Sequence, residues 1–337
     1  MATRKIVTLP GDGIGPEVME QAVRVLEALP LDVEVEQHLF GGAAIDATGD
    51  PLPPETLAAA RASDGVLLGA VGGPKWDGGV RRPEEGLLGL RKELDVYANL
   101  RPAVGDGVDL LIVRELVGGL YFGARGVRAD GTVFDTCEYH PSEVARIARK
   151  AFELARGRSG RLLSVDKANV MDTGRMWRRV VGEIAADFPD VELTHGLVDS
   201  VAMNLVMHPA AYDVLVTENT FGDILSDVAA AVTGGLGLAS SASLGDSDID
   251  GGGPGIFEPV HGSAPDIAGT GKANPTAMLR SLALLLEHGL GERELARAVE
   301  AATDAAAAAA PTTDLGGSAT TAEFGDAVLT SLEVAVA

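Results

Sequence analysis

The stretch at residues 5–29, KIVTLPGDGIGPEVMEQAVRVLEAL, decides the fold class because it runs from a strand through a turn into a helix. The apolar run 5–9 predicts a strand, GDGIG predicts a tight turn, and Pro16 is typical of a first helical position. Apolar residues then recur on one helix face. They are Val18, Ala22, Val25, Leu26 and Leu29. The stretch is therefore predicted to be a β-turn-α unit.

The same alternation continues along the chain. Apolar runs predict strands at 33–37, 65–70, 109–113, 119–122, 162–165, 191–194 and 214–216. Helical periodicity predicts helices at 54–61, 83–94, from 141 onward, 173–186, 201–207, 276–287, 292–308 and 321–334. From about residue 234, glycine-rich turns precede the last three helices. Strands that alternate with helices predict an α/β protein.

Composition limits the classes of function. The 337 residues are 46% hydrophobic, which is ample for one large core or two ordinary ones. Lys and Arg number 27 against 49 Asp and Glu, for a formal charge of −22, so nucleic acid is an unfavourable partner. Cys137 is the single cysteine, which excludes an intrachain disulfide. We expect a cytoplasmic protein with no membrane span, because the N-terminus lacks a signal peptide's apolar core and no apolar run approaches ~20 residues.

The GDGIGPE turn invites comparison with the dinucleotide-binding fingerprint G-x-G-x-x-G. Gly11 and Gly13 fit the pattern, but Pro16 stands at the position of the third glycine. In the fingerprint that glycine allows the helix to pack closely on the strand, and here it is missing. The motif is therefore weak as a phosphate loop. It remains plausible as a backbone turn beside a site.

The stretch TENTFGDILSD, 217–227, carries two carboxylates one helical turn apart just after a strand. Thr220 followed by Asp223 predicts an N-cap with an acidic partner. Asp223 and Asp227 would then share one helix face, where their oxygens could bind a hard divalent cation such as Mg²⁺ or Mn²⁺. For an isolated D-x-x-x-D, a helix-start residue and a solvated residue are the better interpretation.

Several further residue types suit binding or proton transfer. Three arginines at the junctions of helices or strands with turns suit carboxylate clamps. Tyr121 lies among glycines in GGLYFGARG, and Lys167 lies just past an apolar strand in SVDKANV, where open α/β sheets bind ligands. The arginines are Arg91, Arg101 and Arg114. Taken singly, each of these residues is more often structural or solvated than catalytic.

Seven motifs in order resemble the β-decarboxylating dehydrogenases, most closely the branch that acts on 3-isopropylmalate. They are GDGIGPE, GLLGLRKELDVYANLRP, VRELVGGLYFG, SVDKANVMDTG, VDSVAMNLV, NTFGDILSD and FEPVHGSAPDIAGTGKANP. The resemblance implies an α/β, isocitrate/isopropylmalate dehydrogenase-like fold with two domains and a central cleft, not a Rossmann fold. It implies a cofactor-binding domain at 1–97 plus 234–337 and a dimerisation and metal/substrate domain at 98–233.

The implied reaction is NAD-dependent oxidative decarboxylation of 3-isopropylmalate to 4-methyl-2-oxopentanoate. Arg91, Arg101 and Arg114 would hold the malate carboxylates, with Leu87 and Leu88 as an apolar wall. By the same resemblance the protein is a homodimer with shared active sites. The remaining roles are Tyr121 as general acid, Lys167 of the partner subunit as base, and Asp223 and Asp227 with Asp199 of the partner subunit as ligands of Mg²⁺ or Mn²⁺, Asp223 also lying against the substrate.

The resemblance places NAD on HGSAPDIAG and on the turn LGAVGGPKWD. Asp266 favours NAD over NADP, because a carboxylate accepts hydrogen bonds from ribose hydroxyls and repels a 2′-phosphate. His261 is equally typical of a turn histidine. The cofactor residues are Glu84, Glu258, His261, Gly262, Ser263, Ala264, Pro265, Asp266 and Asn274.

Two alternatives and three departures from the family pattern accompany this interpretation. A sister enzyme would act on homoisocitrate, isocitrate, malate or tartrate, and a regulatory subunit would bind ligand without turnover. The connection at 103–107 is shorter than the family pattern, and the loop at 246–255 is longer and more acidic. Glu218 stands where a smaller residue is expected, and the sequence gives it no role.

Overall fold

The computed structural model describes residues 3–105, 107–246 and 254–336, and the chain divides into two compact units. The first unit is Met1–Val96 with Leu236–Ala337, and the second is Tyr97–Gly235. These bounds differ by one or two residues from the division expected from the sequence. Most of the acidic loop, 247–253, lies outside the described residues.

The sheet of the first unit has the strand order β2-β1-β3-β12-β11. Its strands are β1 (Arg4–Gly11), β2 (Val33–Gln37), β3 (Gly65–Ala70), β11 (Ser240–Leu244) and β12 (Gly255–Pro259). Neighbours are parallel except for β11 and β12, which are antiparallel. All six residues of β3 are buried, as a central parallel strand covered on both faces requires.

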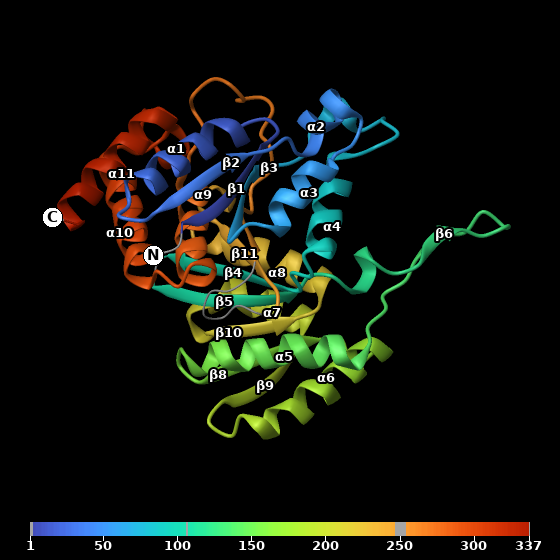
Figure 1. The fold of residues 1–337 in the computed structure, drawn as a ribbon. Helices are drawn as coiled ribbons and strands as arrows, with labels where there is room; N and C mark the ends of the chain where they lie inside the picture. The colour runs from blue at the N-terminus through green and yellow to red at the C-terminus, as the bar shows by residue number, and fades with distance from the viewer. Residues whose placement is uncertain (1–2, 106, 247–253, 337) are drawn as a thin grey trace. The chain divides into compact units, whose positions relative to one another are not determined.

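Helices cover this sheet and supply its core. They are α1 (Gly15–Ala28), α2 (Gly41–Thr48), α3 (Pro54–Arg61), α4 (Pro83–Glu93), α9 (Thr276–Leu284), α10 (Arg293–Ala309) and α11 (Thr321–Val336). A π-helix at Leu285–Gly289 follows α9 directly. The fully buried Phe40, Leu90 and Ile256 pack with strand residues in one core cluster. Helices α1 and α11, from the two ends of the described chain, both belong to this unit (Figure 1).

The sheet of the second unit has the strand order β4-β5-β10-β8-β9. Its strands are β4 (Ala98–Gly105), β5 (Val108–Glu115), β8 (Arg161–Asp166), β9 (Glu192–Leu197) and β10 (Val214–Thr217). The hairpin of β4 and β5 is antiparallel, and the remaining pairs are parallel. Helices must therefore connect the parallel strands.

Two helix pairs cover this second sheet. The pairs are α5 (Pro141–Arg156) with α6 (Asp172–Ile184), and α7 (Val198–Met207) with α8 (Asn219–Val232). Val201, Leu205 and Leu225 from α7 and α8 pack in one core on Leu110 and Ile112 of β5. A ribbon of β6 (Arg125–Val127) and β7 (Val133–Asp135) extends from the body of this unit (Figure 1).

The predicted α/β class and most predicted elements are confirmed, one predicted strand is wrong, and several elements were not predicted. Residues 119–122 are not a strand, because Gly119–Tyr121 forms a short 3₁₀ helix that begins at a glycine with φ of +73°. The glycine-rich region after 234 contains the strands β11 and β12. They were not predicted, because the glycines of this region indicated turns. Helix α2 and strand β4 were not predicted from the sequence either.

In the described part of the chain, no helix is long and apolar enough to span a membrane.

Candidate active site

Helix α8 carries Asp223 and Asp227 one turn apart, directly after β10. The predicted cap is wrong, because the N-cap is Glu218 and Thr220 already lies inside the helix. The buried Glu218 carboxylate accepts a hydrogen bond from the Phe221 backbone N–H at 2.5 Å. Glu218 thus has the capping role that the sequence assigned to Thr220, and it fixes the start of the helix that carries both aspartates.

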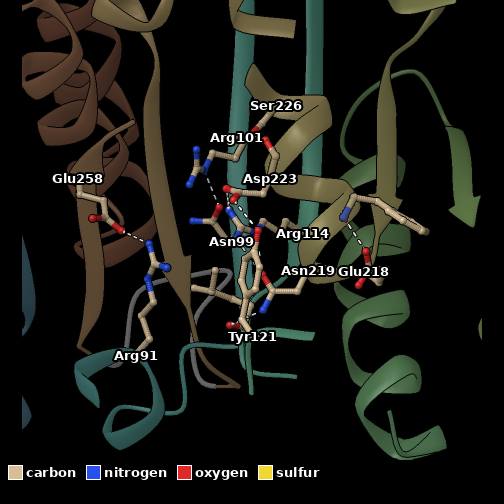
Figure 2. A network of polar contacts seen from close by, with 12 residues as sticks. Arg91, Asn99, Arg101, Arg114, Tyr121, Glu218, Asn219, Asp223, Ser226 and Glu258 are labelled. Carbon is tan, nitrogen blue, oxygen red and sulfur yellow. Dashed lines mark hydrogen bonds and ion pairs between the residues drawn. The ribbon is translucent and has the colours of Figure 1, made fainter. Parts of the chain in front are cut away.

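Arg114, at the carboxyl end of β5, lies between Asn219 and Asp223 (Figure 2). Its guanidinium donates to the Asn219 side-chain oxygen at 3.0 and 2.8 Å and forms an ion pair with Asp223. The Asn219 amide donates in turn to the carbonyls of Leu116 and Gly118, at 3.1 and 3.0 Å. A buried amide therefore holds the arginine against the carboxylate that the sequence singled out.

Tyr121 lies at the end of the 3₁₀ helix, and its hydroxyl donates to Asp223 at 3.0 Å. The Arg114 guanidinium carbon lies 5.9 Å from the centroid of its ring. Burial, followed by the nearby Asp223 charge, raises the pKa of the Tyr121 hydroxyl. The phenol therefore keeps its proton at neutral pH, as a general acid must.

Asp227 lies one turn beyond Asp223, near Arg101 of β4. Burial raises the pKa of Asp227, and the Asp223 charge acts in the same direction, whereas Arg101 and Arg114 oppose it. The Arg101 guanidinium itself is oriented by Asn99, whose oxygen accepts from its Nε at 2.6 Å. Two carboxylates and two arginines are thus brought together within the second unit.

Lys167 and Asp199 lie together as well. The Lys167 ammonium is 2.7 Å from the Asp199 carboxylate, which lies in the first turn of α7, and this pairing lowers the pKa of Asp199. Among the described residues no three His, Cys, Asp or Glu side chains form a metal-ligand cluster. Within one chain, Asp199 is therefore not assembled with Asp223 and Asp227 into a three-carboxylate site.

The predicted site residues of the first unit centre on α4 and β12. The buried Arg91 donates to the buried Glu258 at 2.7 Å, which joins a predicted substrate residue to a predicted cofactor residue (Figure 2). The Arg91 Nε has no partner among the described residues, so one donor stays available. Leu87 packs partly on the core, and Leu88 is partly buried beside it on the same helix. Glu84 opens α4.

The HGSAP segment lies directly against the GDGIG turn. The Ile14 N–H donates to the Ser263 carbonyl at 2.8 Å, and a Cβ on Gly13 would lie 2.0 Å from that carbonyl. Gly13, at φ of +58°, is therefore needed for this close approach. Ala264 has φ of +38°, an uncommon conformation that marks this segment as a candidate binding loop. The interpretation of GDGIG as a turn beside the predicted cofactor segment agrees with this contact.

The polar residues in and after this segment differ in whether their side chains already form hydrogen bonds within the protein. His261 donates from Nδ1 to the Gly262 carbonyl at 2.9 Å, which leaves Nε2 as a buried acceptor with no partner among the described residues. Burial lowers the pKa of His261, so the ring is neutral. The Asn274 side-chain oxygen accepts from the N–H of Thr276, the first residue of α9, at 2.9 Å, and its amide donates to Asp314 at 2.9 Å. Asp266 is exposed in the turn that follows, and Gly262 and Pro265 flank the central residues.

Glu115, the residue after Arg114, is fully buried beneath the loop that leads to Tyr121. Its carboxylate accepts from the Val117 and Gly118 N–H groups at 3.1 and 2.9 Å. Burial raises the pKa of the Glu115 carboxyl to about 7, against the effect of these two hydrogen bonds and of Arg146. The loop beneath Tyr121 thus contains a group that titrates near neutrality.

This titration predicts a pH-dependent stability. The folded protein holds the Glu115 proton more tightly than the unfolded chain, so stability from this group is full below its unfolded pKa of 4.5 and is lost as pH rises through about 7. Glu115→Gln cannot titrate. The difference in unfolding free energy, wild type minus variant, should fall by about 3 kcal/mol between pH 4 and 8, measured by urea unfolding. A pH-independent difference would show that the carboxyl titrates alike in both states.

Sequence reasoning missed three functional side chains. Asn219, Asn99 and Glu218 touch no expected ligand themselves, but they orient Arg114, Arg101 and helix α8 respectively. Asn219 is identifiable as a polar residue two positions after the carboxyl end of an apolar strand, and a position just past such a strand is the signal that singled out Lys167. Asn99 carries no comparable signal.

Comparison with known families supports the expectation from the motifs. The family model described as Isocitrate/isopropylmalate dehydrogenase matches residues 5–328. The 3-isopropylmalate dehydrogenase of Oleidesulfovibrio alaskensis is 54% identical over 88% of this chain and 89% of its own length. That of Novosphingobium aromaticivorans is 52% identical over 97% of this chain and all of its own length.

Solved structures show the same fold. The crystal structure of isocitrate dehydrogenase from Methylococcus capsulatus matches with a TM-score of 0.89 and 37% identity, covering 98% of this chain and 99% of that one. The apo form of a beta-decarboxylating dehydrogenase from Thermococcus kodakarensis matches with a TM-score of 0.82 and 38% identity, covering 99% and 97%.

Proposed function

Because this chain belongs to the isocitrate/isopropylmalate dehydrogenase family, we propose that it catalyses the NAD-dependent oxidative decarboxylation of 3-isopropylmalate. The observation that carries the proposal is the contact of Asp223 with both Arg114 and Tyr121. Two relatives named 3-isopropylmalate dehydrogenase, each more than 50% identical, support this substrate over that of a sister enzyme. A single cysteine is in keeping with a cytoplasmic reaction.

The donor set at α8 fits Mg²⁺ or Mn²⁺. Asp223 and Asp227 offer carboxylate oxygens on one helix face, and the Asp223 side chain is 41% exposed, so it remains accessible. Burial raises the pKa of Asp227, the Asp223 charge acts in the same direction, and a bound cation would favour the ionised form of both carboxylates. When bound, such a cation polarises the oxygens of the substrate as a Lewis acid. Asp199 of the partner subunit would complete the set.

The protein's own residues would bind the substrate and move its protons. Arg91, Arg101 and Arg114 would hold the carboxylates by charge-assisted hydrogen bonds. Lys167 of the partner subunit would accept the hydroxyl proton while hydride passes to the nicotinamide. After carbon dioxide leaves, Tyr121 would protonate the carbon, for which its raised pKa keeps the proton in place.

Exposed apolar side chains support a homodimer. On α7, Met203, Val206 and Met207 are 58, 60 and 59% exposed, and Ile224 on the adjoining α8 is 56% exposed. Met203, Val206 and Met207 share one face of α7, and together with Ile224 on the helix packed against it they expose apolar side chains of the kind that protein partners cover. Asp199 lies on the same helix as these α7 residues, and Lys167 is paired with Asp199. A second copy that packs on these exposed residues would therefore lie close to both. A regulatory subunit is disfavoured, because Tyr121, Lys167 and all three aspartates are retained.

Substrate choice is tested at Leu88. We expect NADH formation with 3-isopropylmalate to exceed that with isocitrate, because a third carboxylate against Leu87 and Leu88 would lose its water without gaining a partner. Leu88→Ala should lower kcat/KM for isopropylmalate about tenfold or more. The kcat/KM for malate, which lacks the alkyl group, should stay within about twofold of the wild-type value. Preference for isocitrate in the wild type would contradict the proposal.

Cofactor choice is tested at Asp266. The wild type should show a much higher kcat/KM with NAD than with NADP, because the exposed carboxylate would repel a 2′-phosphate. Asp266→Asn should narrow that ratio, chiefly through KM for NADP. Glu323→Gln, at an exposed position of the same unit, is the control and should leave the ratio unchanged. Equal use of both cofactors by the wild type would refute the role of Asp266.

A further inference from the structure

Tyr139, between the β6–β7 ribbon and α5, has its hydroxyl at the start of α8. The hydroxyl accepts from the Asn219 backbone N–H at 3.0 Å and donates to the Glu218 carboxylate at 3.4 Å. Its ring packs edge-on against Trp177, with centroids 5.8 Å apart. None of the substrate, metal or cofactor roles described above uses this tyrosine.

The loop that carries Tyr121 is also shaped around Tyr139. A Cβ on Gly118 would lie 2.7 Å from the Tyr139 ring, and one on Gly119 would lie 2.4 Å from its hydroxyl. Both positions therefore require glycine while Tyr139 occupies this place. One side chain thus contacts the loop before Tyr121 and the N-terminus of the helix that carries Asp223.

The direction of each hydrogen bond fixes the arrangement. The single hydroxyl proton goes to Glu218, so a lone pair is left to accept from Asn219. Burial, followed by the charges of Glu115 and Glu218, raises the pKa of Tyr139, which keeps the hydroxyl a donor. Glu218 is itself buried and caps the Phe221 N–H, so the pair locks the helix start.

From this start, hydrogen bonds lead to the site without a break. Tyr139 holds the Asn219 backbone, and the Asn219 side chain holds Arg114 at 2.8 and 3.0 Å. Arg114 then pairs with Asp223, which accepts from Tyr121 at 3.0 Å. A shift of Asn219 would therefore move the guanidinium and the carboxylate together.

We propose that Tyr139 is a positioning residue of the active site, which acts with Glu218 through Asn219 to aim Arg114 and Asp223. This inference rests on the proposed function. It concerns the second unit only, so it predicts an effect on metal binding and on turnover but none on the cofactor residues of the first unit.

Tyr139→Phe is the direct test, because it removes the hydroxyl and keeps the ring against Trp177. Small displacements of catalytic groups cost up to about a hundredfold in rate. We expect kcat to fall about 10- to 100-fold, the dissociation constant for Mn²⁺ to rise at least about threefold by electron paramagnetic resonance titration without substrate, and KM for NAD to stay within about twofold. Glu218→Gln, which keeps an acceptor for Phe221 but loses the charge, should show a smaller change of the same kind.

Tyr212→Phe is the matched control. Tyr212 is a partly buried tyrosine of the same unit, just before β10, whereas Glu218 follows that strand. It should leave both kcat and Mn²⁺ affinity unchanged. Wild-type kcat and Mn²⁺ affinity in Tyr139→Phe would overturn the positioning role alone, and so would equal losses in both tyrosine variants. If Tyr139→Phe does not fold, unchanged values in Glu218→Gln overturn it. A wild type that neither binds Mn²⁺ nor forms NADH would overturn the proposed function together with this role.

Discussion

Asp223→Asn should lower kcat by more than about a hundredfold and abolish measurable Mn²⁺ binding. The Asp223 carboxylate is paired with Arg114, accepts the Tyr121 hydroxyl and shares a helix face with Asp227. An amide keeps the shape but removes the charge, and its N–H₂ group would compete with Arg114 and Tyr121 as a third donor. Because the side chain is 41% exposed, the fold should persist. The measurement is NADH formation from 3-isopropylmalate with Mg²⁺, together with Mn²⁺ titration.

Asp190→Asn provides the matched control for this substitution. Asp190 forms an exposed ion pair with Arg156 in the same unit, and none of the proposed site roles uses either residue. Its loss should leave turnover and Mn²⁺ binding unchanged, because exposed ion pairs contribute little to stability. Full activity in Asp223→Asn, or in wild-type protein stripped by a chelator, would show that the metal site has been assigned to the wrong carboxylates.

Local periodicity was sufficient to predict most of the fold. The bounds 33–37, 54–61 and 65–70 agree residue for residue with β2, α3 and β3, and the starts of α3 and β3 are marked by Pro54 and Gly65. Strand β4 was missed because Arg101 and Pro102 interrupt its apolar pattern, although both lie in the ladder with β5. Its pairing with β5 is a tertiary contact that the local pattern of the sequence does not show.

The site was predictable as a set of residues but not as a set of contacts. The i, i+4 spacing was enough to place Asp223 and Asp227 on one helix face. In contrast, Arg91 and Glu258 are 167 positions apart, and the motifs assigned them to different ligands although they are a buried ion pair. The same holds for Tyr139 and Asn219, 80 positions apart, whose hydrogen bond depends on where α5 begins relative to α8. Such pairings are set by tertiary packing, which a single sequence does not reveal.

The structure also separates the proposed catalytic residues into two groups within one chain. Tyr121 and Asp223 are in hydrogen-bond contact at 3.0 Å, whereas Lys167 is paired with Asp199 at 2.7 Å. If each active site takes Lys167 and Asp199 from the partner subunit, the two groups belong to different sites of one dimer. Mutants that are inactive for different reasons should then complement each other only across these groups.

Mixing Tyr121→Phe subunits with Lys167→Ala subunits should restore about a quarter of wild-type activity. In the heterodimer one site receives both lesions, and the other receives an intact Tyr121 from one chain and an intact Lys167 from its partner. Random exchange makes about half of the dimers mixed, and half of their sites are intact. Exchange through mild denaturant is verified with a mass tag before NADH formation is measured.

Mixing Tyr121→Phe subunits with Asp223→Asn subunits is the control, because both residues belong to the same group. Both residues lie in one chain and in contact, so every site of their heterodimer keeps one lesion and no activity should return. Recovery with Lys167→Ala but not with Asp223→Asn is a pattern that only a site shared between subunits produces, because improved folding or nonspecific stabilisation would act on both mixtures alike. If tagged heterodimers form and neither mixture gains activity, Tyr121 and Lys167 act within one chain, and the ion pair of Lys167 with Asp199 must then open to let the ammonium reach the substrate of its own subunit.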